Sequence, residues 1–315
     1  MTVLQVPPRY EIFMKLMDDQ LDHFWRASGP DKFVTDVADW RALPHNVRRR
    51  IKMCVHILAH MDIEILGNLG AIMSELPHAN EMMAINMCID VQRMMENIHT
   101  IAYDRIDREL EHDLDDGDIV HIQEKVEHLS SYAGQDLPTQ ILAQSCAEGI
   151  SFLTLFPIFY YLRKMGILPE TCTINDEVLR DENIHTRIFI TLYNTLTKDG
   201  TMERLPQSRA HEIIRSFVEA EDRLAMAIYG SMDPDEEEFF TVMNVPNSMT
   251  YTRIAANSVT QALGYDILYP DVADSNPFPF VNQSVMDTLV GFFDRDSAEY
   301  GIRVDHEYES DSDPE

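Results

Sequence analysis

The amino-acid sequence predicts an all-α protein that folds as a helical bundle. Apolar residues recur with helical spacing through most of residues 43–196, and no segment shows a competing strand pattern. Prolines and acidic clusters divide the chain where helices are expected to end. The 315 residues are 45% hydrophobic, which is enough for a sizeable core. We expect one domain over residues 1–300 and a flexible acidic tail over residues 301–315.

The predicted helices follow one another along the chain. The first long helix begins at Pro44, a residue that suits a first helical turn, and it is apolar on more than one face, as a buried central helix is. The fourth ends in basic residues followed by Gly166, which is typical of a helix C terminus. Six helices are expected, from Pro44, over residues 79–110, over 119–132, from Pro138 to Gly166, over 175–196 and after Pro206.

Charge and composition exclude several classes of partner. The chain has 25 Lys and Arg against 54 Asp and Glu, a formal charge of −29 that repels phosphate backbones and anionic lipids. The one compact basic run, Arg48–Arg50, is too short to outweigh this charge. No signal peptide or membrane-span-length uncharged run is found. We therefore expect a cytoplasmic protein that binds neither nucleic acid nor membrane, with buried free thiols at Cys54, Cys88, Cys146 and Cys172.

The sequence ENIHT occurs twice, at residues 96–100 and 182–186. A Glu and a His three positions apart lie on one helix face, so both side chains can reach the same point. Two other such pairs, which begin at Glu75 and Glu109, have polar or proline-containing surroundings that indicate a solvated surface. Buried charged groups need a partner or a metal, so two buried copies suggest one shared site. Apolar residues surround both copies of ENIHT: Met94, Met95, Ile98 and Ile101, and Val178, Leu179, Ile184 and Ile188.

Two further acids interrupt apolar helices. Asp62 lies in the first predicted helix, where His56 or His60 is an alternative partner, and Glu148 lies in the fourth with no base nearby in sequence. In di-metal carboxylate bundles, two helices each supply a Glu-x-x-His and two others each supply one carboxylate. Such an oxygen-rich set suits two iron or manganese ions. The expected ligands are Asp62, Glu96, His99, Glu148, Glu182 and His185.

Aromatic residues accompany the predicted metal ligands. Tyr103 follows His99 by one helical turn, so we expect its hydroxyl to approach the metals. Phe152 and Phe156 follow Glu148 at helical spacing and would form an apolar wall. Together these residues predict an O₂-activating pocket that contains an oxidisable phenol.

These motifs resemble the small, radical-generating subunit of class I ribonucleotide reductase, a ferritin-like family, and the segments DHFWRASG, SNPFPF and GFFDRDSAEYG extend the resemblance over nearly the whole chain. The resemblance implies a ferritin-like helical bundle with additional helices. It implies two iron ions per chain, with manganese as the alternative, and a tyrosyl radical on Tyr103. The large subunit would use this radical to reduce ribonucleoside diphosphates for DNA synthesis. The apolar radical pocket would comprise Phe152, Phe156 and Val178.

The resemblance also implies a route for the radical. It assigns Trp25 and Asp181 to this route, linked to the metal by His99, and it assigns exit to the large subunit to Tyr300. It further implies a homodimer that docks on the large subunit through the C-terminal tail. The chain departs from the family at its terminus, ESDSDPE, which lacks the apolar end that relatives often use for docking.

Two further departures and two alternative functions remain. Leu58-Ala59-His60-Met61 replaces the usual aromatic residues before Asp62, and Leu289-Val290-Gly291 replaces a common Lys-Thr-Asn. One alternative function is a related di-metal oxidase or hydroxylase, which would not need Trp25, Asp181 and Tyr300 together. The other is an inactive relative that serves as a regulatory subunit, and the intact ligand set argues against it.

Overall fold

The computed structural model of the protein describes residues 6–27, 33–77, 80–111, 114–152, 154–272 and 276–281, and in these residues it contains helices and no strands. The 3₁₀-helices η1 (Pro8–Tyr10) and η2 (Asn80–Met82) are short. The longer elements are α1 (Glu11–Asp22), α2 (Val34–Ala42), α3 (His45–Glu75), α4 (Met83–Glu109), α5 (Asp116–Ser130), α6 (Leu137–Cys146), the π-helix η3 (Ala147–Phe152), α7 (Pro157–Met165), α8 (Pro169–Lys198), α9 (Gln207–Tyr229), α10 (Pro234–Phe239) and α11 (Val245–Ala262).

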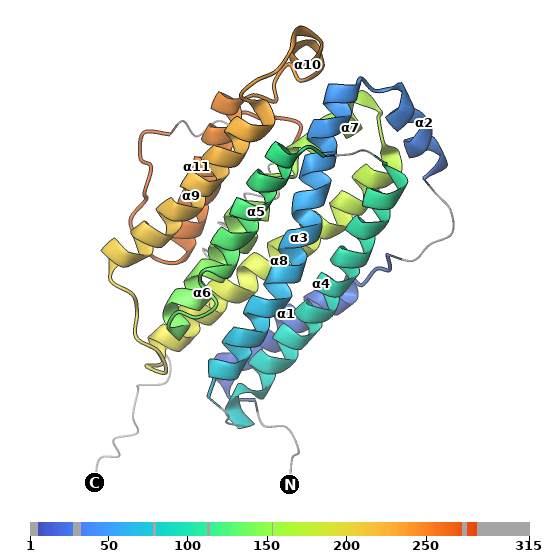
Figure 1. The fold of residues 1–315 in the computed structure, drawn as a ribbon. Coiled ribbons are helices and arrows are strands. Elements are labelled where there is room, and N and C mark those ends of the chain that lie inside the picture. The colour runs from blue at the N-terminus through green and yellow to red at the C-terminus, as the bar shows by residue number, and fades with distance from the viewer. Residues whose placement is uncertain are drawn as a thin grey trace, which may run out of the picture.

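Four elements form the centre of the bundle: α3, α4, the continuous α6–η3 segment and α8. α3 packs on α4 and α6 packs on α8, while contacts between α3 and α6 and between α4 and α8 close the ring. Figure 1 shows α3 and α4 side by side across the middle of the molecule. A cluster of buried apolar side chains runs through this ring, so charged groups inside it are shielded from water.

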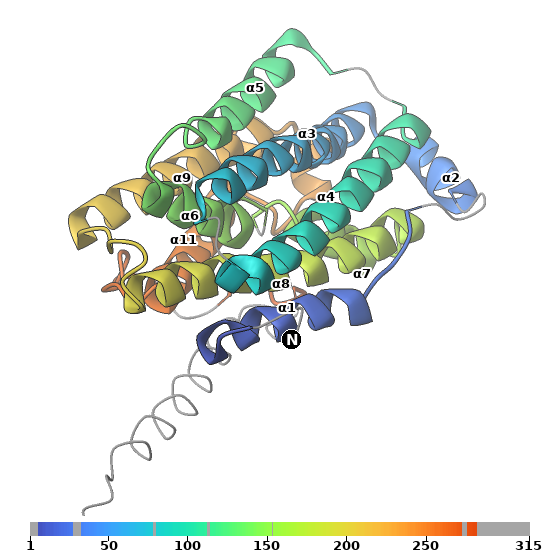
Figure 2. The same cartoon turned by 90° about the horizontal axis from the view of Figure 1, so that it is seen from below.

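The remaining helices cover two sides of the ring. α5 packs on α3, while α9 and α11 pack on each other and on the α6–η3 segment. On the other side, α1 contacts α4 and α8, and α2 contacts α8. Figure 2 shows α1 crossing beneath α8 on the side of the bundle away from α5.

The predictions for α3, α4, α5, α8 and α9 are confirmed, with differences at the helix ends. α3 begins directly after Pro44. α8 begins at Pro169 instead of residue 175, because Asp36 of α2 accepts hydrogen bonds from the backbone N–H groups of Glu170 (3.0 Å) and Thr171 (2.7 Å). These are N–H groups that a helix start leaves without a partner in the helix itself.

The prediction of one continuous helix from Pro138 to Gly166 was wrong. The segment is divided into α6, η3 and α7, with a π-helical turn over Ala147–Phe152 and a new start at Pro157. Proline has no backbone N–H, so it favours a helix start over a helix interior. By length and composition Leu137–Met165 is apolar enough to span a membrane, but 94% of its most apolar window is buried, as in a core helix. The sequence did not predict α1, α2, α10 and α11 individually.

The basic run at the start of α3 is used inside the molecule. Arg49 forms an ion pair with Asp118 (2.7 Å), and the buried Arg50 pairs with Glu236. This run therefore does not form a free basic surface.

All four cysteines are buried free thiols, as predicted. Tyr300 and the predicted tail, residues 301–315, lie outside the described residues.

Candidate metal centre

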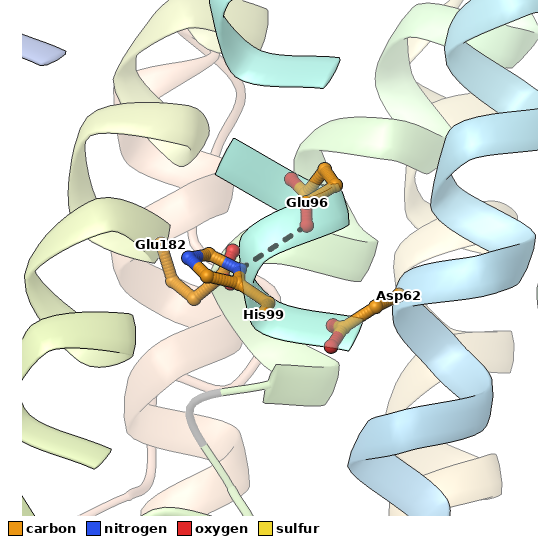
Figure 3. A group of neighbouring side chains, drawn as sticks. All are labelled: Asp62, Glu96, His99 and Glu182. Atoms are coloured by element: carbon orange, nitrogen blue, oxygen red, sulfur yellow. Dashed lines mark ion pairs between the residues drawn. The ribbon is translucent and has the colours of Figure 1, made fainter. Parts of the chain in front are cut away.

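Six charged or imidazole side chains converge in the middle of the helical ring, and all six are fully buried. Figure 3 shows four of them pointing toward one another from three helices. α3 contributes one carboxylate, η3 contributes another, and α4 and α8 each contribute a Glu and a His. The six residues are Asp62, Glu96, His99, Glu148, Glu182 and His185, the set that the sequence predicted to meet.

The ligand atoms form two overlapping groups, and within each group they all lie within 4.8 Å of one another. Glu96 and Glu182 belong to both groups, so their carboxylates could help to hold an ion at either one. Each remaining ligand belongs to one group, so each group has a carboxylate and an imidazole of its own. The first group is Asp62, Glu96, His99 and Glu182, and the second is Glu96, Glu148, Glu182 and His185.

Each imidazole lies between the two shared carboxylates. His99 Nδ1 is 3.3 Å from Glu96 Oε2 and 3.0 Å from Glu182 Oε1. His185 Nδ1 is 2.9 Å from Glu96 Oε1 and 3.1 Å from Glu182 Oε2. The two imidazoles and the two shared carboxylates therefore lie within ion-pair distance of one another at the centre of the site.

Several carboxylate oxygens in the centre lack a hydrogen-bond partner. Both oxygens of Asp62 and Oε2 of Glu148 are buried without one. The alternative partners proposed for Asp62, His56 and His60, make other contacts. His60 Nδ1 lies 2.8 Å from the backbone carbonyl of His56, and His56 Nδ1 lies 3.3 Å from Asp107 Oδ1. An unsatisfied buried group costs about 1–3 kcal/mol. Oxygens in this state, facing other carboxylates, fit two hard cations.

Burial and mutual charge shift the pKa values of the ligands in both directions. Burial, reinforced by Glu96 and Glu182, raises the pKa of Asp62 and of Glu148 well above their ordinary values. Burial lowers the pKa of His185, but the same two glutamates outweigh it and raise this pKa to about 10. Burial raises the pKa of Glu96, and the neighbouring imidazoles outweigh it and lower this pKa to about 2. Cations entering the centre would therefore displace protons.

Two amide side chains that the sequence analysis missed orient Glu148. Its Oε1 accepts hydrogen bonds from Gln92 Nε2 (3.0 Å) and Gln144 Nε2 (2.6 Å). Both amides are buried. With Oε1 held in this way, Oε2 is left to face the second ligand group. Gln92 and Gln144 lie one turn before Glu96 and Glu148, and this spacing was the one available signal in the sequence.

Tyr103 lies fully buried on α4, one turn beyond His99. Its hydroxyl donates a hydrogen bond to Asn175 Oδ1 at 2.9 Å, a partner that the sequence did not predict. Burial, with the charges of Asp62 and Glu182, raises the pKa of Tyr103 well above its ordinary value, so the phenol is neutral. The three residues predicted to line its pocket are buried in the same core: Phe152, Phe156 and Val178.

Asp181 connects Trp25 to the metal centre. Its Oδ2 accepts a hydrogen bond from Trp25 Nε1 (2.8 Å) and lies 3.0 Å from His99 Nε2. The rings of Trp25 and His99 are also stacked, with centroids 6.0 Å apart and an interplanar angle of 21°. The half-buried Trp25 is thus linked through Asp181 to a fully buried predicted ligand.

The apolar neighbours of the first ENIHT copy predicted a buried segment, and this prediction was only partly right. Met94 and Ile101 are 39% and 55% exposed. Glu96 and His99 are nevertheless buried, because they lie on the opposite face of α4. Around the second copy the indication was right, since its four apolar neighbours are buried: Val178, Leu179, Ile184 and Ile188.

Comparison with known proteins matches most of the chain to one family. Residues 3–277 match the family model described as ribonucleotide reductase, small chain. The chain is 27% identical to the ribonucleoside-diphosphate reductase small chain of Nicotiana tabacum, over 98% of this chain and 93% of that one. It is also 27% identical to the corresponding chain of Trypanosoma brucei brucei, over 84% and 77% of the two chains.

Solved structures share the fold. The ribonucleotide reductase R2 subunit from Clostridium botulinum superposes with a TM-score of 0.74 at 21% identity, covering 90% of this chain and 88% of that one. Streptococcus sanguinis dimanganese(II)-NrdF superposes with a TM-score of 0.64 at 19% identity, covering 89% and 95%. These similarities support a ferritin-like helical bundle, as the sequence predicted.

Proposed function

The chain belongs to the family of ribonucleotide reductase small chains, and from this premise we propose that it generates a tyrosyl radical on Tyr103 and supplies it to the large subunit of a ribonucleoside-diphosphate reductase. The observation that carries the proposal is a buried phenol one helical turn from two overlapping groups of metal ligands. The ribonucleotide itself would bind to the large subunit. We expect the complex to act in the cytoplasm.

The proposed cofactor is a pair of iron ions, with a pair of manganese ions as the alternative. When bound, the metals would supply the O₂ activation that oxidises the phenol. Glu96 and Glu182 would help to hold both ions, because each belongs to both ligand groups. Gln92 and Gln144 would hold the carboxylate of Glu148 in position by donating hydrogen bonds to its Oε1.

The residues around Tyr103 would protect the radical. The side chain is fully buried, so water and dissolved reductants are kept from the phenol. Its raised pKa keeps the proton on the hydroxyl until oxidation, so a proton must leave together with the electron. The apolar pocket that excludes water would consist of Phe152, Phe156 and Val178.

The proposed exit route starts at His99 and runs through Asp181 to Trp25. The hydrogen bonds of 3.0 Å and 2.8 Å at Asp181 Oδ2 offer a path on which a proton shift accompanies electron transfer. Tyr300 would carry the radical onward to the large subunit. We also propose that the tail, residues 301–315, docks on the large subunit and that the chain forms a homodimer. The exposed apolar side chains of α3 and α4 would lie at the dimer interface.

The central experiment is reconstitution of the purified chain with ferrous iron and O₂. The wild type should bind about two metal ions per chain and give a tyrosyl electron paramagnetic resonance (EPR) signal. Tyr103→Phe should retain the metals and lose the signal. Tyr251→Phe, which changes another buried tyrosine, is the matched control and should retain both. A signal that persists in Tyr103→Phe would place the radical on a different residue.

A second experiment separates the route from the radical. Asp181→Asn, Trp25→Phe and Tyr300→Phe should each form the Tyr103 radical and lose reductase turnover with the cognate large subunit. Turnover that survives all three changes would contradict the proposed route. Oxidation of a small molecule without the large subunit would favour a di-metal oxidase or hydroxylase. Failure to bind iron or manganese would favour an inactive regulatory relative.

A further inference from the structure

Asn175 is a polar residue that contacts the proposed radical site. It belongs neither to the metal centre nor to the exit route. It lies on α8 and is 0% exposed, and its Oδ1 accepts the hydrogen bond of the Tyr103 hydroxyl at 2.9 Å. We propose that Asn175 sets the oxidising strength of the Tyr103 radical by accepting a hydrogen bond that only the reduced phenol can donate. This inference rests on the proposed function.

The orientation of the Asn175 amide is fixed by a second contact. Its Nδ2 donates to the backbone carbonyl of Thr171 at 2.9 Å, one turn earlier on α8. Turning the amide over would bring Oδ1 against that carbonyl, which places two acceptors together without a proton. Thr171 therefore keeps the amide oxygen, and not the NH₂ group, directed at the phenol.

Oxidation of Tyr103 breaks the O–H bond that makes this contact. The metal centre of the proposed function would supply the oxidant and take up the electron and the phenolic proton, because an amide oxygen is too weak a base to keep the proton. The neutral radical oxygen then faces the amide oxygen of Asn175 with no proton between them. The hydrogen bond stabilises only the reduced phenol, so its presence makes the radical a stronger oxidant.

No other residue in the described part of the chain offers this hydroxyl a hydrogen bond. A buried phenol without a hydrogen-bond partner is costly, so the contact with Asn175 stabilises the reduced state. The other side chains predicted to line the pocket are apolar and can accept no proton: Phe152, Phe156 and Val178.

The variant Asn175→Leu removes the acceptor with little change in size, and Asn175→Val is a second apolar variant in case the first folds poorly. Asn183→Leu is the matched control. It changes the same residue type on the same helix and removes the same kind of bond, from Asn183 Nδ2 to the carbonyl of Leu179 (2.8 Å), but Asn183 does not bond to Tyr103.

The first readout uses the metal-free protein. Infrared difference spectra with isotope-labelled tyrosine should show one phenol C–O–H band that shifts between the wild type and Asn175→Leu and stays unchanged in Asn183→Leu. The second readout is the half-life of the reconstituted EPR signal. A weaker oxidant is reduced more slowly, so the half-life in Asn175→Leu should be about fivefold longer, the factor that corresponds to one ordinary hydrogen bond.

Three results would overturn the inference. An infrared band that does not shift would show that the hydrogen bond on which the inference rests is absent. An unchanged half-life would leave Asn175 with a purely structural role. An exchangeable proton coupled to the wild-type radical, and absent in Asn175→Leu, would show that the amide donates to the radical and acts in the opposite direction. A wild type with the infrared band and no radical on Tyr103 would instead overturn the proposed function itself.

Discussion

Asp62 shows most directly the cost of keeping a metal ligand in a protein core. Its carboxylate is fully buried, and neither oxygen has a hydrogen-bond partner. Burial raises its pKa well above the ordinary value, because the charged form is costly in a core. The unsatisfied group weakens the metal-free fold and at the same time leaves two oxygens free for a cation.

We predict that Asp62→Leu stabilises the metal-free protein and impairs the metal centre. Replacing an unsatisfied buried group by an apolar one of similar size should raise the free energy of unfolding by about 1–3 kcal/mol. Urea unfolding in the presence of a chelator measures this change, and metal analysis should show fewer than two ions per chain. Glu64→Leu, on the same helix, is the control and should change neither result. A destabilised Asp62→Leu protein would contradict the prediction.

The sequence predicted that the six buried ligands meet, but it did not predict which amide side chains contact the site. Acids inside apolar helical runs are costly without a partner, so their positions carry information. Gln92, Gln144 and Asn175 are neutral amides, a residue type that lies mostly on protein surfaces, so their burial could not be expected. Their roles depend on side chains from other helices, and helical spacing does not reveal those contacts.

The π-helix η3 is the element that places Glu148. Helical periodicity predicted a continuous helix here, because a single π-turn changes the spacing too little to be read from one sequence. Gly149 lies in this turn, where a Cβ atom would meet Val259 Cγ2 at 2.6 Å and Thr186 Cγ2 at 2.9 Å. The missing side chain therefore lets η3 pack closely against α8 and α11.

We predict that Gly149→Ala forces η3 away from its neighbours and disturbs the metal centre through Glu148. Overpacking of this kind should lower the free energy of unfolding by about 1–3 kcal/mol, and metal occupancy should fall with it. Chemical unfolding and metal analysis test both effects. Gly67→Ala is the contrasting control, because a Cβ at Gly67 meets nothing within 4 Å and alanine favours a helix. Equal effects of the two substitutions would contradict this explanation.

The contact between α2 and α8 should make stability depend on pH. Glu170 at the start of α8 faces Asp36, and the hydrogen bond with Asp36, together with burial, raises the pKa of Glu170 from 4.5 to about 7. A group with a raised pKa stabilises the fold while it is protonated. Its contribution is fully present below about pH 4.5 and is lost as the pH rises through about 7.

We therefore predict that Glu170→Gln reduces the loss of stability between about pH 5 and pH 8, because glutamine carries no charge at any pH in this range. The measurement is the difference in the free energy of unfolding between wild type and variant across this range. The difference should favour the variant increasingly as the pH rises. Parallel profiles would show that the two carboxyl groups do not interact.

At the scale of the whole molecule, the sequence predicted the all-α class and the ferritin-like bundle, because long amphipathic segments and paired Glu-x-x-His motifs are properties of the chain itself. The sequence did not predict which outer helices cover which side of the ring. That arrangement depends on matching surfaces between distant segments, such as α9 and α11 against the α6–η3 segment.

The outer faces of α3 and α4 provide a test of the proposed homodimer. Ile63 on α3 is 52% exposed, and Met94 and Ile101 on α4 are 39% and 55% exposed, while the predicted ligands on the same two helices are buried. A charge at these positions should oppose association without touching the metal centre, because burying an unpaired charge is costly.

We predict that the double variant Met94→Asp, Ile101→Asp is a monomer under conditions in which the wild type is a dimer. Analytical ultracentrifugation should give the mass of one chain for the variant and of two for the wild type. Val120→Asp changes a similarly exposed apolar residue on α5 and should remain dimeric. Iron binding by the double variant should stay near two ions per chain, because all six predicted ligands come from a single chain. A dimeric double variant would place the interface on another face, and a monomeric wild type would contradict the proposed homodimer.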